Sequence, residues 1–207
     1  MEKRIFTFNA EIRAAGEDKP EIMGRGAVVG SVTDLGWFEE EIAADAFRDA
    51  DLTDVCVCFN HDLSVILGRN SAGTANIEVD EDGNLMYRAH DIDLENPSVK
   101  SAVRYIQRGE VNKSSFMFEI KEEGWGDSEK YGKYGKRTIY KVGKVYEAGP
   151  VTFPAYDDTD AGARSAVVQS RDKWVQANVT PTEHMIDENI ARDLDIVSIA
   201  VERYKNY

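Results

Sequence analysis

The sequence predicts a mostly β domain with flanking helices, an α+β fold, which is followed by a helical C-terminal tail. Short runs of alternating apolar and polar residues, such as the run at 3–12, are typical of half-buried strands. Clusters of turn residues, such as DEDG at 80–83, separate these runs. Many short strands between turns favour a barrel or a sandwich over a parallel sheet.

Length and composition indicate a globular protein and exclude several classes of function. The 207 residues are 42% hydrophobic and 10% aromatic, which suits a substantial core. The formal net charge of -13 argues against nucleic-acid binding, which needs a basic surface. No apolar run reaches the roughly 18 residues of a membrane span, and the start MEKRIFTFNAEIR is not typical of a signal peptide. We therefore expect a cytoplasmic protein with no membrane partner.

The first part of the chain supplies several short strands. Strands are expected at 3–12, 21–32 and 55–60, with a turn at 17–20 and, at 37–47, a short helix or a strand that leads into one. The apolar run at 55–60 contains Cys56 and Cys58, which would face the same side of a strand. Because a disulfide between them would need poor geometry, we expect two buried thiols.

Two hairpins and one helix are predicted next. The first hairpin follows a turn-rich connection at 66–73 and pairs 74–79 with 84–90 around Asp82-Gly83. The second hairpin pairs 114–120 with 138–147 and has an exposed loop at 125–136. The helix begins at Asn96, a favoured capping residue, with Pro97 at its first position, and it ends before Gly109. Its apolar stripe comprises Val99, Val103 and Ile106.

The composition changes after Asp157, so we divide the chain into a β domain at 1–157, a linker at 158–181 and an amphipathic helix at 182–207. The stripe of the last helix comprises Ile186, Ile190, Leu194, Val197, Val201 and Tyr204. An apolar stripe of this kind must be covered, either by the β domain or by a partner.

Three polar residues at or beside predicted strands have the side chains of a hydrolase site. A serine hydroxyl is a weak nucleophile unless a neighbouring base takes its proton. Histidine serves as that base near neutral pH, and a carboxylate on its far ring nitrogen orients it. Ser115, His61 and Glu147 supply these parts if their strands are neighbours in space.

Linked motifs support the same grouping. They are GRGAVVGSVT (24–33) with FEEEIAADAF (38–47), CFNHDLSVILGR (58–69), NKSSFMFEI (112–120) and EAGPVTFPAY (147–156). Together they resemble the motifs of the tailed-phage prohead maturation proteases, serine enzymes related to herpesvirus assemblin. The resemblance covers roughly residues 5–157, in the family's order.

The resemblance implies an assemblin-like closed β-barrel and a serine endopeptidase that needs no cofactor and no metal. Ser115 then corresponds to the nucleophile, His61 to the general base and Glu147 to the third member. Met117 and Gly149 depart from the family, which usually has glycine and serine at these positions. The implied substrates are scaffold and major capsid protein segments, and the enzyme itself, inside the assembling prohead in the bacterial host cytoplasm. The linker at 158–181 is then the candidate region for self-cleavage.

Several alternatives stay open at this point. The chain could instead be a catalytically silent scaffold- or capsid-binding module of the same fold, or a hydrolase of that fold with another substrate. A homodimer or higher oligomer is compatible with the resemblance, as is either a phage or a prophage origin.

Rival site residues are also present. Ser114 adjoins Ser115 and would face the other side of a strand, and the motif alignment favours Ser115. His90 is the rival third member, but we interpret it and His184 as surface residues. Asp62 and Asp91 are typical turn residues, so we do not interpret them as metal ligands.

Overall fold

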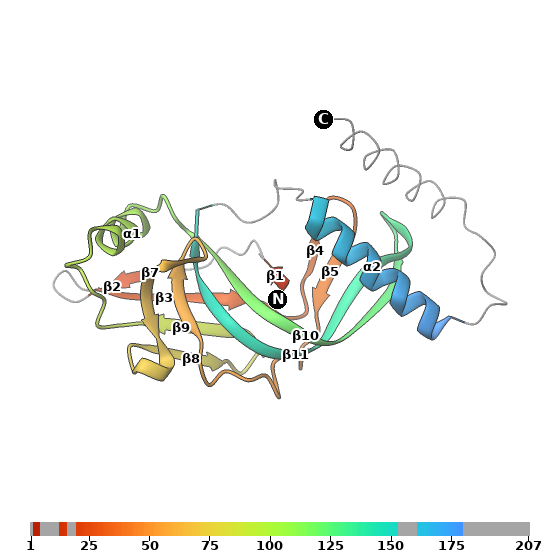
Figure 1. Cartoon of the computed structure of the whole chain (residues 1–207), viewed down its shortest axis with the longest axis horizontal. Coiled ribbons are helices and arrows are strands. Elements are labelled where there is room, and N and C mark those ends of the chain that lie inside the picture. The colour runs from red at the N-terminus through yellow and green to blue at the C-terminus, as the bar shows by residue number, and fades with distance from the viewer. Residues whose placement is uncertain (1, 5–12, 16–19, 153–160, 180–207) are drawn as a thin grey trace. The chain divides into compact units, whose positions relative to one another are not determined.

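The structure is a computed structural model that describes residues 2–4, 13–15, 20–152 and 161–179. It confirms the mostly β, α+β class (Figure 1). The strands are β1 (Glu2–Arg4), β2 (Arg13–Ala15), β3 (Glu21–Ala27), β4 (Val32–Asp34), β5 (Glu39–Ile42), β6 (Cys56–Phe59), β7 (Asp62–Arg69), β8 (Ala75–Val79), β9 (Leu85–Ala89), β10 (Lys113–Ser128) and β11 (Gly132–Val151). The helices are α1 (Pro97–Gln107) and α2 (Ala161–Asn178), and a short 3-10 helix, η1, spans Asn70–Ala72.

The described strands form two sheets. The first has the order β1-β10-β11-β5-β4, with β6 also paired to β11 and β7 paired to β6. The second has the order β2-β3-β9-β8 and is antiparallel throughout. Within the described ranges no strand pairing joins the ends of either sheet, so the closed barrel that the family resemblance implies is not found there. Side-chain packing, rather than a continuous hydrogen-bond ladder, connects the two sheets.

The long hairpin β10–β11 is the central element of the first sheet, and Figure 1 shows its two strands side by side along their length. The exposed loop predicted at 125–136 is wrong, because both strands continue through it and a turn remains only at 129–131. Trp125 explains the difference: its ring is buried and lies 5.6 Å from that of Phe38. An aromatic side chain at this point favours pairing over a solvated loop.

Two other expectations change in the first half. The stretch 37–47 contains the strand β5 followed by turns, not a helix, because β5 pairs with β11 and β4. The first half of the connection predicted at 66–73 belongs to β7, whose pairing with β6 continues to Arg69, and η1 follows at 70–72. The hairpin predicted around Asp82-Gly83 is confirmed as β8–β9, and Gly83 has the positive φ of 90° that its turn needs.

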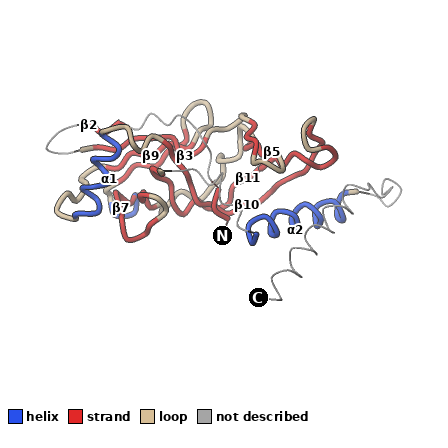
Figure 2. Tube along the Cα trace, turned by 90° about the horizontal axis from the view of Figure 1, so that it is seen from above, coloured by secondary structure: helices blue, strands red, loops and turns tan. Residues whose placement is uncertain are grey.

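Helix α1 has the predicted beginning and end. The Asn96 side chain accepts a hydrogen bond of 3.0 Å from the Ser98 N–H, and Gly109 follows with a φ of 73°. The predicted stripe of Val99, Val103 and Ile106 is buried. Figure 2 shows α1 beside β7, so its apolar face covers one end of the core.

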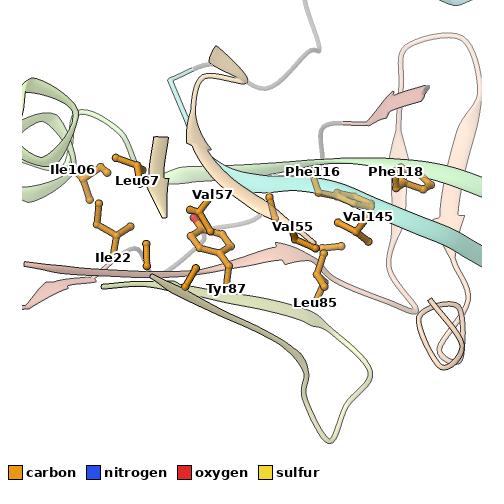
Figure 3. Packing of buried hydrophobic residues seen from close by; sticks show 14 of the residues in the cluster. Ile22, Val55, Val57, Leu67, Leu85, Tyr87, Ile106, Phe116, Phe118 and Val145 are labelled. Carbon is orange, nitrogen blue, oxygen red and sulfur yellow. The ribbon is translucent and has the colours of Figure 1, made fainter. Parts of the chain in front are cut away.

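The core lies between the two sheets. Figure 3 shows Tyr87, Ile22 and Leu85 from the second sheet facing Val57, Phe116 and Val145 from the first. The rings of Phe116 and Phe118 stack with centroids 4.4 Å apart. This packing fixes β10 against the second sheet on one face and leaves its other face for the residues predicted to form the site.

The linker predicted at 158–181 contains helix α2, in which Val167 and Val175 are buried. The tail helix predicted at 182–207 lies outside the described residues. No helix in the described ranges is both long and apolar enough to cross a membrane.

Candidate active site

His61 lies at the tip of a tight hairpin. Strands β6 and β7 are joined by Asn60 and His61 alone, with Phe59 paired to Asp62 across the turn. Both turn residues have positive φ, 54° and 59°, as a type I′ turn requires. The sequence pattern places His61 directly after a strand. In the structure His61 lies in the turn itself, where the chain reverses between β6 and β7.

The hairpin brings His61 to Glu147 on β11. His61 Nδ1 lies 2.5 Å from Glu147 Oε2, and the carboxylate is fully buried. An ionised carboxylate can only accept, so with a neutral ring this contact puts the proton on Nδ1 and a lone pair on Nε2. Nε2 is buried and has no hydrogen-bond partner among the residues that the structure describes. A buried acceptor without a partner is unfavourable for stability, and it suits a general base.

Ser115 shares a sheet face with Glu147. In the antiparallel pairing of β10 with β11, Ser115 is opposite Gly149, and Met117 is opposite Glu147. Directly opposed residues project from the same face, as do residues two apart on one strand. The side chains of Ser115, Met117 and Glu147 therefore lie on one face. Met117 is buried, so it places an apolar side chain beside the carboxylate.

Ser114 lies on the opposite face of β10, toward the second sheet. Its hydroxyl oxygen is 2.7 Å from the hydroxyl oxygen of Tyr87 on β9, and both residues are buried. Burial raises the pKa of Tyr87, so its hydroxyl stays protonated. Ser114 is thus part of the hydrogen-bonded core and not of the face that carries Glu147.

Asn60 connects the hairpin tip to the strand that carries Glu147. Its N–H donates to the Pro150 carbonyl at 2.9 Å. Its side-chain oxygen accepts from the Thr152 N–H at 2.7 Å, and its amide nitrogen donates to the Thr152 hydroxyl at 3.1 Å. We call this set of bonds the Asn60 clasp. Sequence reasoning missed it, although an Asn directly after a strand is a signal for a two-residue hairpin turn.

The two cysteines beside the site are free thiols, as predicted. Cys58 donates a hydrogen bond to the Cys56 sulfur at 3.2 Å. This bond, together with burial, raises the pKa of the Cys58 thiol, which therefore remains protonated. A neutral buried thiol is a poor nucleophile, so Cys58 does not compete with Ser115 for that role.

The remaining candidates lie elsewhere or outside the described residues. His90 follows β9 and pairs with Asp91 at 3.2 Å. His184 lies outside the described residues. The described part of the chain contains no group of three or more histidine, cysteine or carboxylate side chains arranged to hold a metal ion.

A serine on the same sheet face as a buried carboxylate, with a histidine hydrogen-bonded to that carboxylate, is the set of side chains that serine hydrolases use. Comparison with known protein families specifies the class further. Residues 8–173 match the family of caudovirus prohead serine proteases, and the chain belongs to that family. Searches among curated proteins and among solved structures found no match.

Proposed function

We propose that the chain is a serine endopeptidase that cleaves scaffold and capsid-protein segments, and itself, during maturation of the phage prohead. The family supports the setting, which is the assembling prohead in the host cytoplasm. The observation that supports catalysis most directly is the bond between His61 Nδ1 and Glu147 Oε2, formed on the sheet face that also carries Ser115.

The proposed reaction proceeds in two stages. Ser115 Oγ attacks the carbonyl carbon of the scissile bond while His61 Nε2 takes the hydroxyl proton. The tetrahedral intermediate then breaks its C–N bond, and Nε2 returns the proton to the leaving amine. A water molecule attacks the acyl-enzyme by the same route and releases the acid. Throughout, Glu147 keeps the proton of the resting ring on Nδ1 and stabilises the imidazolium that forms.

Burial places a condition on this reaction. Ser115 exposes 0% of its surface, and the His61 side chain exposes 11%. A peptide therefore reaches the hydroxyl only after a covering segment moves. Self-cleavage within α2 carries a similar condition, because a protease binds an extended chain and the helix must unwind first.

The proposal is tested by following the intact mass of the purified protein over time, alone and with the phage's major capsid protein added. Wild type and Ser114→Ala are expected to shorten the capsid protein or themselves, and Ser115→Ala is not. Cleavage that is unaffected by Ser115→Ala would rule out the assigned nucleophile. No cleavage of either protein by wild type would favour the alternative, a catalytically silent module that binds scaffold or capsid protein.

A further inference from the structure

We propose that Asn60 and Thr152 are positioning residues, which hold the His61 ring in line with Glu147 and Ser115 through the Asn60 clasp. The inference rests on the proposed serine-protease function. It assigns part of the catalytic geometry to two residues that take no part in the bond-making steps themselves.

The backbone at the hairpin tip needs support from outside the turn. Asn60 and His61 both have positive φ. Asparagine and histidine both adopt this region more often than most residues do, but the second position of a type I′ turn is usually glycine. The sequence thus places the catalytic histidine where the turn alone would prefer another residue. Contacts beyond the hairpin must therefore maintain the conformation.

The clasp supplies these contacts from the strand that also carries Glu147. Pro150 accepts from the Asn60 backbone, and Thr152 bonds to both polar atoms of the Asn60 side chain. Glu147 lies three residues before Pro150 on the same strand. The hairpin tip is therefore attached to β11 and its end at two places, through the clasp and through His61 Nδ1.

Two attachments on one strand fix an orientation that a single attachment does not. With the Glu147 bond alone, the turn could rotate about that bond, and Nε2 would then change its direction relative to the sheet face that carries Ser115. A displacement of about 1 Å in catalytic geometry can reduce a rate by about 100-fold. The three hydrogen bonds of the clasp resist this rotation.

Three variants separate positioning from turn formation. Asn60→Gly removes both side-chain bonds of the clasp, but it keeps the backbone N–H and makes positive φ easier. Thr152→Val removes only the hydroxyl, with little change in shape, whereas Thr152→Ser keeps a hydroxyl at this position. Thr53→Val is the matched control. Thr53 is exposed, and this change also removes one hydroxyl hydrogen bond, which the Thr53 side chain donates to the Asp51 carboxylate at 2.6 Å.

Two measurements are made on each folded variant of the full chain. The first is the rate at which diisopropyl fluorophosphate labels Ser115, followed by mass; Ser115 Oγ bonds to phosphorus, fluoride leaves, and His61 takes the proton. The second is the far-downfield proton NMR resonance of His61 Nδ1–H, assigned by its loss in His61→Ala. Neither measurement requires a known peptide substrate.

We expect Asn60→Gly to lower the labelling rate by about 10- to 100-fold and to shift or broaden the Nδ1–H resonance. Thr152→Val should lower the rate by about 2- to 10-fold, as the loss of one hydrogen bond implies, and Thr152→Ser should restore it. Thr53→Val should label at the wild-type rate. Thermal unfolding of each variant checks that the chain remains folded.

Wild-type labelling rates and an unchanged Nδ1–H resonance in both Asn60→Gly and Thr152→Val would overturn the proposal, and would leave the clasp as a stabilising contact only. If Asn60→Gly fails to fold, the comparison of Thr152→Val with Thr152→Ser decides. A wild type that shows the resonance but is neither labelled nor cleaves the capsid protein would refute the protease function; the clasp's effect on the ring would then still be decided by the NMR measurement.

Discussion

Gly149 lies directly against the backbone of Cys58: a β-carbon on Gly149 would come within 2.1 Å of the Cys58 carbonyl oxygen. Gly149 is also the residue opposite Ser115 in the β10–β11 ladder. The absence of a side chain therefore allows β6 to approach the sheet beside the proposed nucleophile, and the β6–β7 hairpin then reaches Glu147.

The first prediction concerns this contact. Gly149→Ser should lower the free energy of unfolding by about 1–3 kcal/mol, because backbone must move to admit the side chain. Cleavage should fall as well, because the movement displaces His61. Gly126→Ala is the control, since a β-carbon there meets no atom within 4 Å. Chemical denaturation of both variants tests this, and equal stability of Gly149→Ser and wild type would contradict the close packing.

The second prediction separates the adjacent serines. Ser114→Ala leaves the buried Tyr87 hydroxyl without its partner and should cost about 1–3 kcal/mol of stability while cleavage continues. Ser115→Ala should abolish cleavage. Adding Tyr87→Phe to Ser114→Ala should cost less than the sum of the single changes, because both remove the same bond. Additive losses in this double-mutant cycle would show that the two hydroxyls do not interact.

The third prediction tests the carboxylate. Glu147→Gln keeps the size of the side chain, but it removes the charge that stabilises the imidazolium and allows the wrong ring tautomer. Cleavage or labelling should slow by about 100- to 10,000-fold. Glu119→Gln, an exposed carboxylate on the same hairpin, is the control and should have the wild-type rate. A wild-type rate for Glu147→Gln would remove Glu147 from the proposed mechanism.

The fourth prediction concerns the effect of low pH on the contacts between Asp34 and the turn of the β10–β11 hairpin. Hydrogen bonds from Lys130 and Tyr131 lower the pKa of Asp34 from 3.8 to about 2. Because the folded-state pKa is lowered, the associated stability is present above pH 3.8 and is lost as the pH falls toward 2. A carboxyl-carbon NMR titration should give a midpoint near 2 for Asp34, and Lys130→Met should raise it. A midpoint of 3.8 in wild type would show that these exposed contacts do not persist in solution.

Local patterns in the sequence were sufficient to predict the elements whose cause is itself local. The capping of α1 by Asn96 and the turn at Gly83 depend on residues a few positions apart, and both predictions are confirmed. The expected faces of Ser114 and Ser115 follow from strand alternation, which the pairing of β10 with β11 preserves up to Met117. The continuation of β10 through Trp125 was not predictable in this way, because the partner of that ring, Phe38, is far away in the sequence.

The sequence by itself determined the class of the domain, the family and the three residues to consider, because alternation, turn chemistry and linked motifs are properties of short segments. Only the tertiary structure decided that His61 meets Glu147, since residues 86 positions apart become neighbours through the pairing of β6 with β11. It also decided which features support that meeting, namely the Asn60 clasp and the space at Gly149. These depend on where one backbone crosses another, and no pattern within a single segment specifies that crossing.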